Sequence, residues 1–141
     1  MTKFYLAGPM TGIPQSNFPM FDRVTRVLRS RGHEVCSPAE MDRAMGIDPD
    51  RPETSKDIDW SDVMLADLKA ILDCDGIVLL PGWENSNGAR LERTVAESTG
   101  RLVYIWNSST EKVEFTTPWT DNEIIYKMGR REWQFLDKVT S

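Results

Sequence analysis

The 141-residue chain has few of the residues on which many catalytic and metal sites depend. Its one histidine, His33, lies in a predicted turn, which removes the main ingredient of histidine-based triads and of His-ligated metal sites. It has two cysteines, Cys36 and Cys74, and each adjoins an apolar segment. We therefore expect two buried, reduced thiols rather than a disulfide, as is usual in a cytoplasmic protein.

Positive charge in excess and long apolar runs are also missing. The formal net charge is −5 and the Lys and Arg residues are dispersed, so the chain lacks the basic surface that binding to a nucleic-acid backbone needs. No apolar run is long enough to span a bilayer, and no charged-then-apolar signal segment begins the chain. These absences predict a soluble, cytoplasmic protein whose partner is neither a nucleic-acid polymer nor a membrane.

An acidic segment in the middle of the chain could suggest a Mg²⁺ or Ca²⁺ site. Its acids are Asp48, Asp50, Asp57, Asp59 and Asp62. The segment lacks the alternating ligands and the central glycine of a calcium loop. Acids also favour the start of a helix. We therefore interpret it as a solvated loop that leads into a helix, and we expect neither a metal nor a cofactor.

Short apolar runs alternate with segments of helical periodicity along the chain. Strands are predicted at 3–7, 34–36, 76–80 and 102–106, and helices at 18–31, 61–72, 89–99 and 121–139. This alternation predicts one α/β domain over residues 1–141, a Rossmann-like three-layer α/β/α sandwich with a mostly parallel sheet of four to five strands. Residues 41–57 are predicted to form a surface loop that begins with a short helical piece at 40–45, and residues 107–120 a polar connection.

The chemistry is predicted to lie between the strand at 76–80 and the helix at 89–99, because ligands of open parallel sheets bind at such strand-to-helix loops. This stretch reads Pro-Gly-Trp-Glu-Asn-Ser-Asn-Gly-Ala-Arg-Leu-Glu over residues 81–92. Glu92 falls in the predicted opening turn of the helix, where the helix dipole favours an ionised carboxylate. Such a carboxylate can serve as a nucleophile. The alternative is an ordinary acid near a helix start.

Three motifs, in this order and spacing, resemble the nucleoside 2-deoxyribosyltransferase-like superfamily. They are Tyr5-Leu6-Ala7-Gly8-Pro9, Asp67-Leu68 with Asp75, and Ser86-x-Gly88-x-x-x-Glu92. The resemblance extends to about Asn107. The sequence of the third motif is most similar to that of a small branch common in phage and bacterial genomes. The superfamily includes transferases that exchange bases on deoxyribose and hydrolases that cleave (deoxy)nucleoside 5′-monophosphates to base and sugar phosphate. It also implies a homodimer or a larger homo-oligomer.

The resemblance implies a role for each matching residue. Glu92 matches the nucleophile that forms a covalent sugar ester, Tyr5 the tyrosine that orients it, and Asp67 the acid that handles the leaving base. Without the resemblance, Tyr5 fits a half-buried strand residue and Asp67 a solvent-facing helix residue. The candidate substrate-binding residues are Gly8, Pro9, Thr11, Gly12, Trp83, Ser86, Gly88 and Asn107.

Cleavage of an N-glycosidic bond needs one ionised and one protonated carboxyl group. A helix start near Glu92 and a more enclosed setting for Asp67 predict an ionised Glu92 and a protonated Asp67. Trp83 lies in the same loop, and we leave open whether its ring stacks on a base or packs in the core.

Position 86 bears on the substrate. In the transferases an acid stands six residues before the nucleophile, whereas in the 5′-monophosphate hydrolases a serine does, and Ser86 with the Gly88 amide can donate hydrogen bonds to a phosphate. The hydrolases also have an arginine in the loop after the first strand, but residues 10–12 hold none. Arg90 or a basic residue of another subunit could replace it.

The sequence thus predicts an enzyme, a hydrolase or transferase that acts on the N-glycosidic bond of a (deoxy)nucleoside 5′-monophosphate through Glu92. Two alternatives stay open. One is a module of the same fold that binds a nucleotide or a nucleotide-like signal without turnover, which the missing arginine favours. The other is an oligomeric structural protein without a ligand.

Overall fold

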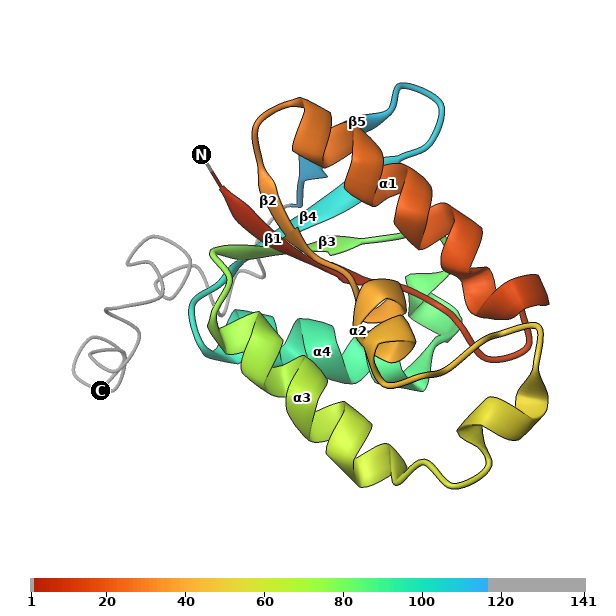
Figure 1. Ribbon diagram of the computed structural model, residues 1–141. Coiled ribbons are helices and arrows are strands. Elements are labelled where there is room, and N and C mark those ends of the chain that lie inside the picture. The colour runs from red at the N-terminus through yellow and green to blue at the C-terminus, as the bar shows by residue number, and fades with distance from the viewer. Residues whose placement is uncertain (1, 117–141) are drawn as a thin grey trace, which may run out of the picture.

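The computed structural model describes residues 2–116, which form a five-stranded sheet in the order β2-β1-β3-β4-β5 with helices on both faces. The strands are β1 (Lys3–Ala7), β2 (Glu34–Cys36), β3 (Gly76–Leu79), β4 (Leu102–Asn107) and β5 (Lys112–Phe115). The helices are α1 (Phe18–Ser30), α2 (Pro38–Ala44), α3 (Trp60–Leu72) and α4 (Asn87–Ser98), with short 3₁₀ turns at Pro14–Asn17, Pro52–Ser55 and Trp83–Asn85. Figure 1 shows α1 on one face and α3 and α4 on the other, which confirms the predicted three-layer α/β fold.

The first four strands in spatial order are parallel, and their side chains alternate between two cores. Phe4 and Leu6 of β1 pack toward α1, whereas Tyr5 and Ala7 pack toward α3 and α4. Every residue of β3 is buried, as expected for a parallel strand covered on both faces. Tyr5 therefore lies on the face of the sheet that α3 and α4 cover.

The direction of strand order reverses between β1 and β3, because β2 lies on one side of β1 and β3 on the other. Open α/β sheets bind ligands at this position, beyond the carboxyl ends of the two strands. The loops after β1 and β3 meet there, since a Cβ atom on Gly82 would lie 3.1 Å from Cγ of Pro9. The fold thus places the predicted strand-to-helix loop at the position where ligands are expected.

Two segments differ from the prediction. The connection at 107–120 contains β5, which pairs antiparallel with β4 and was missed because its mostly exposed side chains show no buried alternation. The short helical piece predicted at 40–45 corresponds to α2, which begins two residues earlier and runs over Pro38–Ala44, because Pro38 lies in its first turn, where proline favours a helix start. The predicted helix at 121–139 lies outside the described residues.

The remaining expectations concern the cysteines, metals and membranes. Cys74 is buried, but Cys36 is only partly buried, so the prediction of two buried thiols is half right. A hydrogen bond with Cys74 lowers the pKa of Cys36 to about 7. Within residues 2–116, no group of three His, Cys, Asp or Glu side chains could hold a metal ion. In the same residues, no helix has both the length and the apolar character to cross a membrane.

Candidate active site

Glu92 lies on the sheet-facing side of α4. The buried residues of α4 are Ala89, Glu92 and Ala96, and their spacing of three and four residues places them on one face. Glu92 is only 6% exposed, whereas its neighbour Leu91 is 44% exposed. A carboxyl group thus occupies an inward position where an apolar side chain is usual.

The hydroxyl group of Tyr5 donates a buried hydrogen bond to Oε2 of Glu92. Tyr5 has no exposed surface. Burial, followed by the negative charge of Glu92, raises the pKa of Tyr5 well above its usual value. Tyr5 therefore keeps its proton and serves as a hydrogen-bond donor to the carboxyl group.

Asp67 occupies the corresponding inward position of α3. It lies one helical turn from each of the buried residues of that helix, Val63 and Ile71. Its Oδ1 atom is buried and has no hydrogen-bond partner among the described residues. Burial, followed by the charge of Asp42, raises the pKa of Asp67 to about 7. The structure thus gives Asp67 an inward orientation rather than the solvent-facing alternative.

Burial raises the pKa of both carboxyl groups for which the sequence predicts opposite protonation states. Burial raises the pKa of Glu92 to about 8, although the hydrogen bond from Tyr5 lowers it, and the charges of Asp67 and Asp42 raise it further. The helix begins at Asn87, so Glu92 is in its second turn, beyond the first-turn N–H groups. Desolvation therefore outweighs the helix dipole at Glu92.

Asp42 is a third acid of this site, and sequence reasoning missed it. It lies on the buried face of α2 with Pro38 and Ala39 and is 7% exposed. Burial raises the pKa of Asp42 to about 6. Its negative charge contributes to the raised pKa values of Tyr5, Asp67 and Glu92. The sequence does contain one indication. Asp42 follows Ala39 by three residues in a helix that begins with Pro38, and this spacing puts the two side chains on the same helix face.

The loop before α4 presents polar groups at the helix start. The Oγ atom of Ser86 accepts a hydrogen bond from the Ala89 N–H at 3.2 Å, which caps α4 and leaves the hydroxyl proton available to a ligand. A Cβ atom on Gly88 would approach only Ser86 Oγ, at 4.0 Å, so there is open space around this glycine. Arg90 is exposed one turn later, where its N–H donates to the Ser86 carbonyl at 2.9 Å.

The loop after β1 lies close to the β3 loop. A Cβ atom on Gly8 would lie 2.8 Å from Cβ of Leu80, so internal packing by itself explains this glycine. Pro9 accepts a hydrogen bond from the side chain of Asn17 at 2.9 Å. Thr11 and Gly12 are exposed, and Gly12 adopts a positive φ of 81° in the turn.

Two candidate substrate-binding residues have contacts within the protein. Trp83 packs against the core cluster around Tyr5, and the guanidinium group of Arg93 lies 4.7 Å from its ring centroid. These contacts favour the core-packing interpretation of Trp83. Asn107 is engaged in the β4–β5 turn, where Oδ1 accepts hydrogen bonds from the Ser109 and Thr110 N–H groups. The structure does not bring its side chain into contact with Tyr5 or Glu92.

An open groove of about 700 Å³ lies at the start of α1 and beside residues 46–50. Its wall includes the ion pair between Arg43 and Asp22, whose atoms are 2.6 Å apart. Neither Tyr5, Asp67 nor Glu92 lines it. The groove is therefore separate from the acidic site.

Residues 2–105 match the family described as Domain of unknown function (DUF4406). The chain belongs to this family. The DUF4406 family is part of the nucleoside 2-deoxyribosyltransferase-like superfamily, as the motifs predicted. No curated protein matches the chain.

Two solved structures have the same fold as this DUF4406 protein. The 2-deoxyribosyltransferase of Bacillus psychrosaccharolyticus is similar with a TM-score of 0.56 and 18% identity, over 82% of this chain and 99% of that one. The solution structure of BlsM is similar with a TM-score of 0.58 and 18% identity, over 99% of this chain and 94% of that one. At this identity the likeness establishes the fold, and the reaction has to be argued from the site.

Proposed function

We propose that this DUF4406 protein cleaves or transfers the N-glycosidic bond of (deoxy)nucleoside 5′-monophosphates through a covalent glycosyl–Glu92 intermediate. The buried hydrogen bond between Tyr5 and Glu92 carries this proposal. A carboxyl group on the inward face of a helix destabilises the fold unless it is neutral or well paired. Perturbed acids of this kind cluster at functional sites. The fold shared with a 2-deoxyribosyltransferase supports the same reaction class.

In the first step the Glu92 carboxylate attacks the anomeric carbon while the bond to the base nitrogen breaks. The base leaves with the electron pair of that bond and takes a proton from Asp67. Tyr5 holds Oε2 of Glu92, so Oε1 is the oxygen available to the sugar. In the second step water, or the nitrogen of another base, attacks the anomeric carbon and gives its proton to Asp67. Glu92 then leaves as a carboxylate.

This sequence starts from an ionised Glu92 and a protonated Asp67. In the substrate-free protein, burial raises both pKa values into the neutral range, to about 8 for Glu92 and about 7 for Asp67. The positive charge that develops on the sugar favours ionised Glu92 during the reaction. The plot of kcat/KM against pH should therefore be bell-shaped. Its two apparent pKa values, near 7 and near 8, describe the coupled pair of Glu92 and Asp67.

The variant Tyr5→Phe is expected to lower kcat/KM by about 10- to 100-fold, the range for a hydrogen bond to a charged group. Because the Tyr5 hydroxyl lowers the pKa of Glu92, its loss should also move the alkaline limb to higher pH. Tyr104→Phe is the matched control, since Tyr104 is partly buried against the opposite core. A Tyr5→Phe profile that superimposes on the wild type would contradict the assigned role.

Recognition of the phosphate is assigned to Ser86 and Arg90. Arg90→Ala is expected to raise KM for 5′-monophosphates by about 10-fold, as one charge-assisted hydrogen bond is lost, and to leave the KM for the matching nucleosides unchanged. Arg31→Ala, an exposed arginine after α1, serves as the control. Equal changes for nucleotides and nucleosides would exclude a phosphate contact.

Chromatography of nucleosides and nucleotides incubated with the protein tests the proposed function directly. Free base released without an acceptor indicates a hydrolase, and a new nucleoside or nucleotide formed only with an added acceptor base indicates a transferase. Absence of both products from every substrate would contradict the proposed reaction.

A second candidate is a module that binds a nucleotide without turnover. The proton that Glu92 holds at neutral pH and the lack of an arginine at 10–12 favour it. Calorimetry that detects tight binding, with no base released over hours, would support this candidate. Rapid turnover would dismiss it.

We also propose that the protein acts as a homodimer or larger homo-oligomer. Several large apolar side chains of α3 and α4 are exposed, namely Trp60 (58%), Leu65 (59%), Leu72 (44%) and Leu91 (44%). Leu65 and Leu72 lie seven residues apart and so on the same side of α3. Exposed apolar patches are typical of protein interfaces. Light scattering on the purified protein tests this proposal, since a monomer at micromolar concentration would contradict it.

A further inference from the structure

The two cysteines come from distant parts of the sequence but lie on the same face of the sheet. Cys36 ends β2 and pairs in register with Tyr5 of β1. Side chains of residues paired in this way point to the same face of a sheet, so Cys36 lies on the face that α3 and α4 cover. There it packs against the core cluster that contains both Tyr5 and Cys74.

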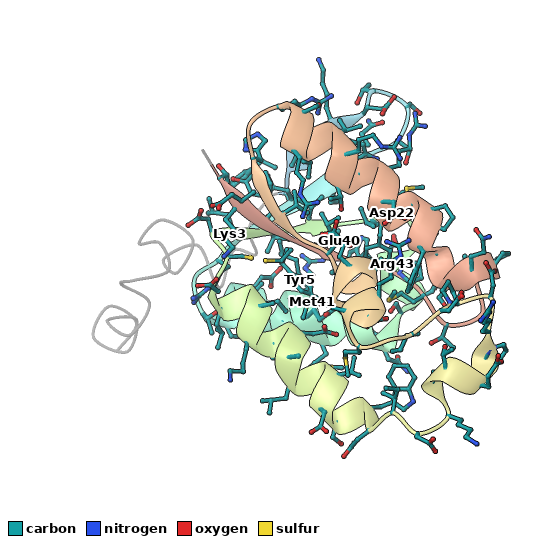
Figure 2. All side chains as sticks on the ribbon, in the orientation of Figure 1. Lys3, Tyr5, Asp22, Glu40, Met41 and Arg43 are labelled. Atoms are coloured by element: carbon teal, nitrogen blue, oxygen red, sulfur yellow. The ribbon has the colours of Figure 1, made fainter. Side chains whose placement is uncertain are left out.

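Lys3 holds the segment that carries Cys74 against the start of β1. Cys74 lies between Asp73 and Asp75, and both neighbours are bonded to Lys3. The ammonium group of Lys3 lies 2.5 Å from Oδ2 of Asp73. The Asp75 N–H donates to the Lys3 carbonyl at 2.8 Å, and its side chain accepts a hydrogen bond from the Lys3 N–H at 2.9 Å. Lys3 and Tyr5 are two residues apart on β1, as Figure 2 shows, so Cys74 and Cys36 meet on one side of this strand.

The two thiol groups are hydrogen-bonded to each other, and they differ in charge. The hydrogen bond with Cys74 lowers the pKa of Cys36 to about 7, although burial opposes this shift. The positive charges of Lys3 and Arg29 also lower it, and the negative charge of Asp73 raises it. The same hydrogen bond, followed by burial, raises the pKa of Cys74. Near neutral pH a large fraction of Cys36 is therefore thiolate and accepts a hydrogen bond from the Cys74 thiol.

Only one of the two sulfur atoms can meet a solute. Cys36 is partly exposed on β2, which is an edge strand, whereas Cys74 has no exposed surface. A partly exposed thiolate near cationic groups is the form of cysteine that reacts with oxidants. A second thiol within hydrogen-bond reach can then attack the oxidised sulfur. The pair thus combines an accessible nucleophile with a buried resolving thiol.

We propose that Cys36 and Cys74 are a redox-sensitive pair, which a hydroperoxide converts to a disulfide that thiol reductants reverse. The Cys36 thiolate attacks one peroxide oxygen, so that an S–O bond forms, the O–O bond breaks and the sulfur loses two electrons. The second oxygen takes a proton and leaves as water or an alcohol. The Cys74 thiol then attacks the sulfur of the Cys36 sulfenic acid, the S–S bond forms, and hydroxide leaves with the Cys74 proton as water.

Oxidation of Cys36 also removes the obstacle to the second step. The hydrogen bond to the Cys36 thiolate is the main cause of the raised pKa of Cys74. A sulfenic acid is neutral, so this cause disappears when Cys36 is oxidised. The disulfide joins the end of β2 to the turn after α3. It does not depend on the function proposed above.

Mass spectrometry of the full chain treated with hydrogen peroxide tests this inference. The wild type should stay monomeric in mass and lose about 2 Da, and dithiothreitol should restore both thiols. The chain has no other cysteine, so trypsin should release residues 32–43 linked to residues 70–90. In Cys74→Ala the reaction should stop at the Cys36 sulfenic acid, which dimedone traps. In Cys36→Ala the remaining thiol should be consumed at least about 10-fold more slowly than the wild-type thiols, because it is buried and protonated.

The wild-type measurement decides the inference even if a variant fails to fold. A wild type that keeps both thiols under peroxide would overturn it. So would a wild type whose Cys36 is oxidised to the sulfinic acid, or linked to a second chain, without a bond to Cys74. Equal rates of thiol loss in folded Cys36→Ala and Cys74→Ala would contradict the assignment of Cys36 as the residue that meets the oxidant.

Discussion

Replacing Glu92 by glutamine is expected to lower the rate of base release by about 10⁴-fold or more, the scale seen when a catalytic nucleophile is removed. Glutamine keeps the size of the side chain and can still accept the Tyr5 hydrogen bond, but it cannot form the sugar ester. Base release under single-turnover conditions, followed by chromatography, measures this loss. Both the covalent step and the charge stabilisation that precedes it depend on the same carboxylate.

The control for this variant is Glu84→Gln, which changes an exposed acid in the loop just before α4. It should retain the wild-type rate. If Glu92→Gln kept more than a tenth of the wild-type rate, another group would have to be the nucleophile.

The same substitution is expected to stabilise the protein at alkaline pH. The pKa of Glu92 is raised from its ordinary 4.5 to about 8 in the folded protein. The folded state therefore binds this proton more tightly than the unfolded state does, and the contribution of Glu92 to stability falls as pH rises from 4.5 to 8. Glutamine does not ionise, so Glu92→Gln escapes this loss. We expect it to be more stable than the wild type by about 2–4 kcal/mol at pH ~9.

Thermal unfolding of both proteins at acidic and alkaline pH measures this effect. At pH ~9 the melting temperature of Glu92→Gln should be higher by about 5–10 °C, and at pH ~5, where Glu92 is neutral, the two proteins should unfold within a few degrees of each other. Glu84→Gln should follow the wild type at both pH values. An equal difference at both pH values would show that packing, rather than a buried charge, separates the two proteins.

A loss of activity combined with a gain of stability would identify Glu92 as a residue kept for function. Stabilising substitutions at active sites often have this cost, because the site needs groups that the fold alone would not bury. Asp42 and Asp67 are buried in the same region, and burial raises the pKa of each. Each of the three helices that carry these acids thus has a carboxyl group at an inward position where an apolar side chain would stabilise the fold more.

The sheet and its covering helices could be predicted from the sequence because short apolar runs with glycine and proline at their ends have few other interpretations. The strand at 3–7 matches β1 and that at 34–36 matches β2, while the strand at 76–80 is one residue longer than β3. Sequence motifs of the superfamily also predicted the contact between Tyr5 and Glu92. These features follow from local residue pattern and from a few fixed spacings.

The inward faces of the helices could not be predicted from the same pattern. In α3, apolar residues lie nearly all round the helix, so their periodicity favours no face. The structure exposes Leu65 and Leu72 and turns Asp67 inward. Asp42 was missed for a related reason, since the apolar residues around it are few and the segment resembles a loop. The tertiary fold, rather than propensity, decides both orientations.

The covalent intermediate is the central claim, and mass spectrometry of the quenched protein tests it most directly. Wild-type protein mixed with a cleaved nucleotide and stopped with acid during turnover should gain the mass of one sugar phosphate, and peptide mapping should place it on Glu92. Glu92→Gln should gain none. Base release by a wild-type protein whose Glu92 peptide stays unmodified, or a sugar attached to another residue, would contradict the account.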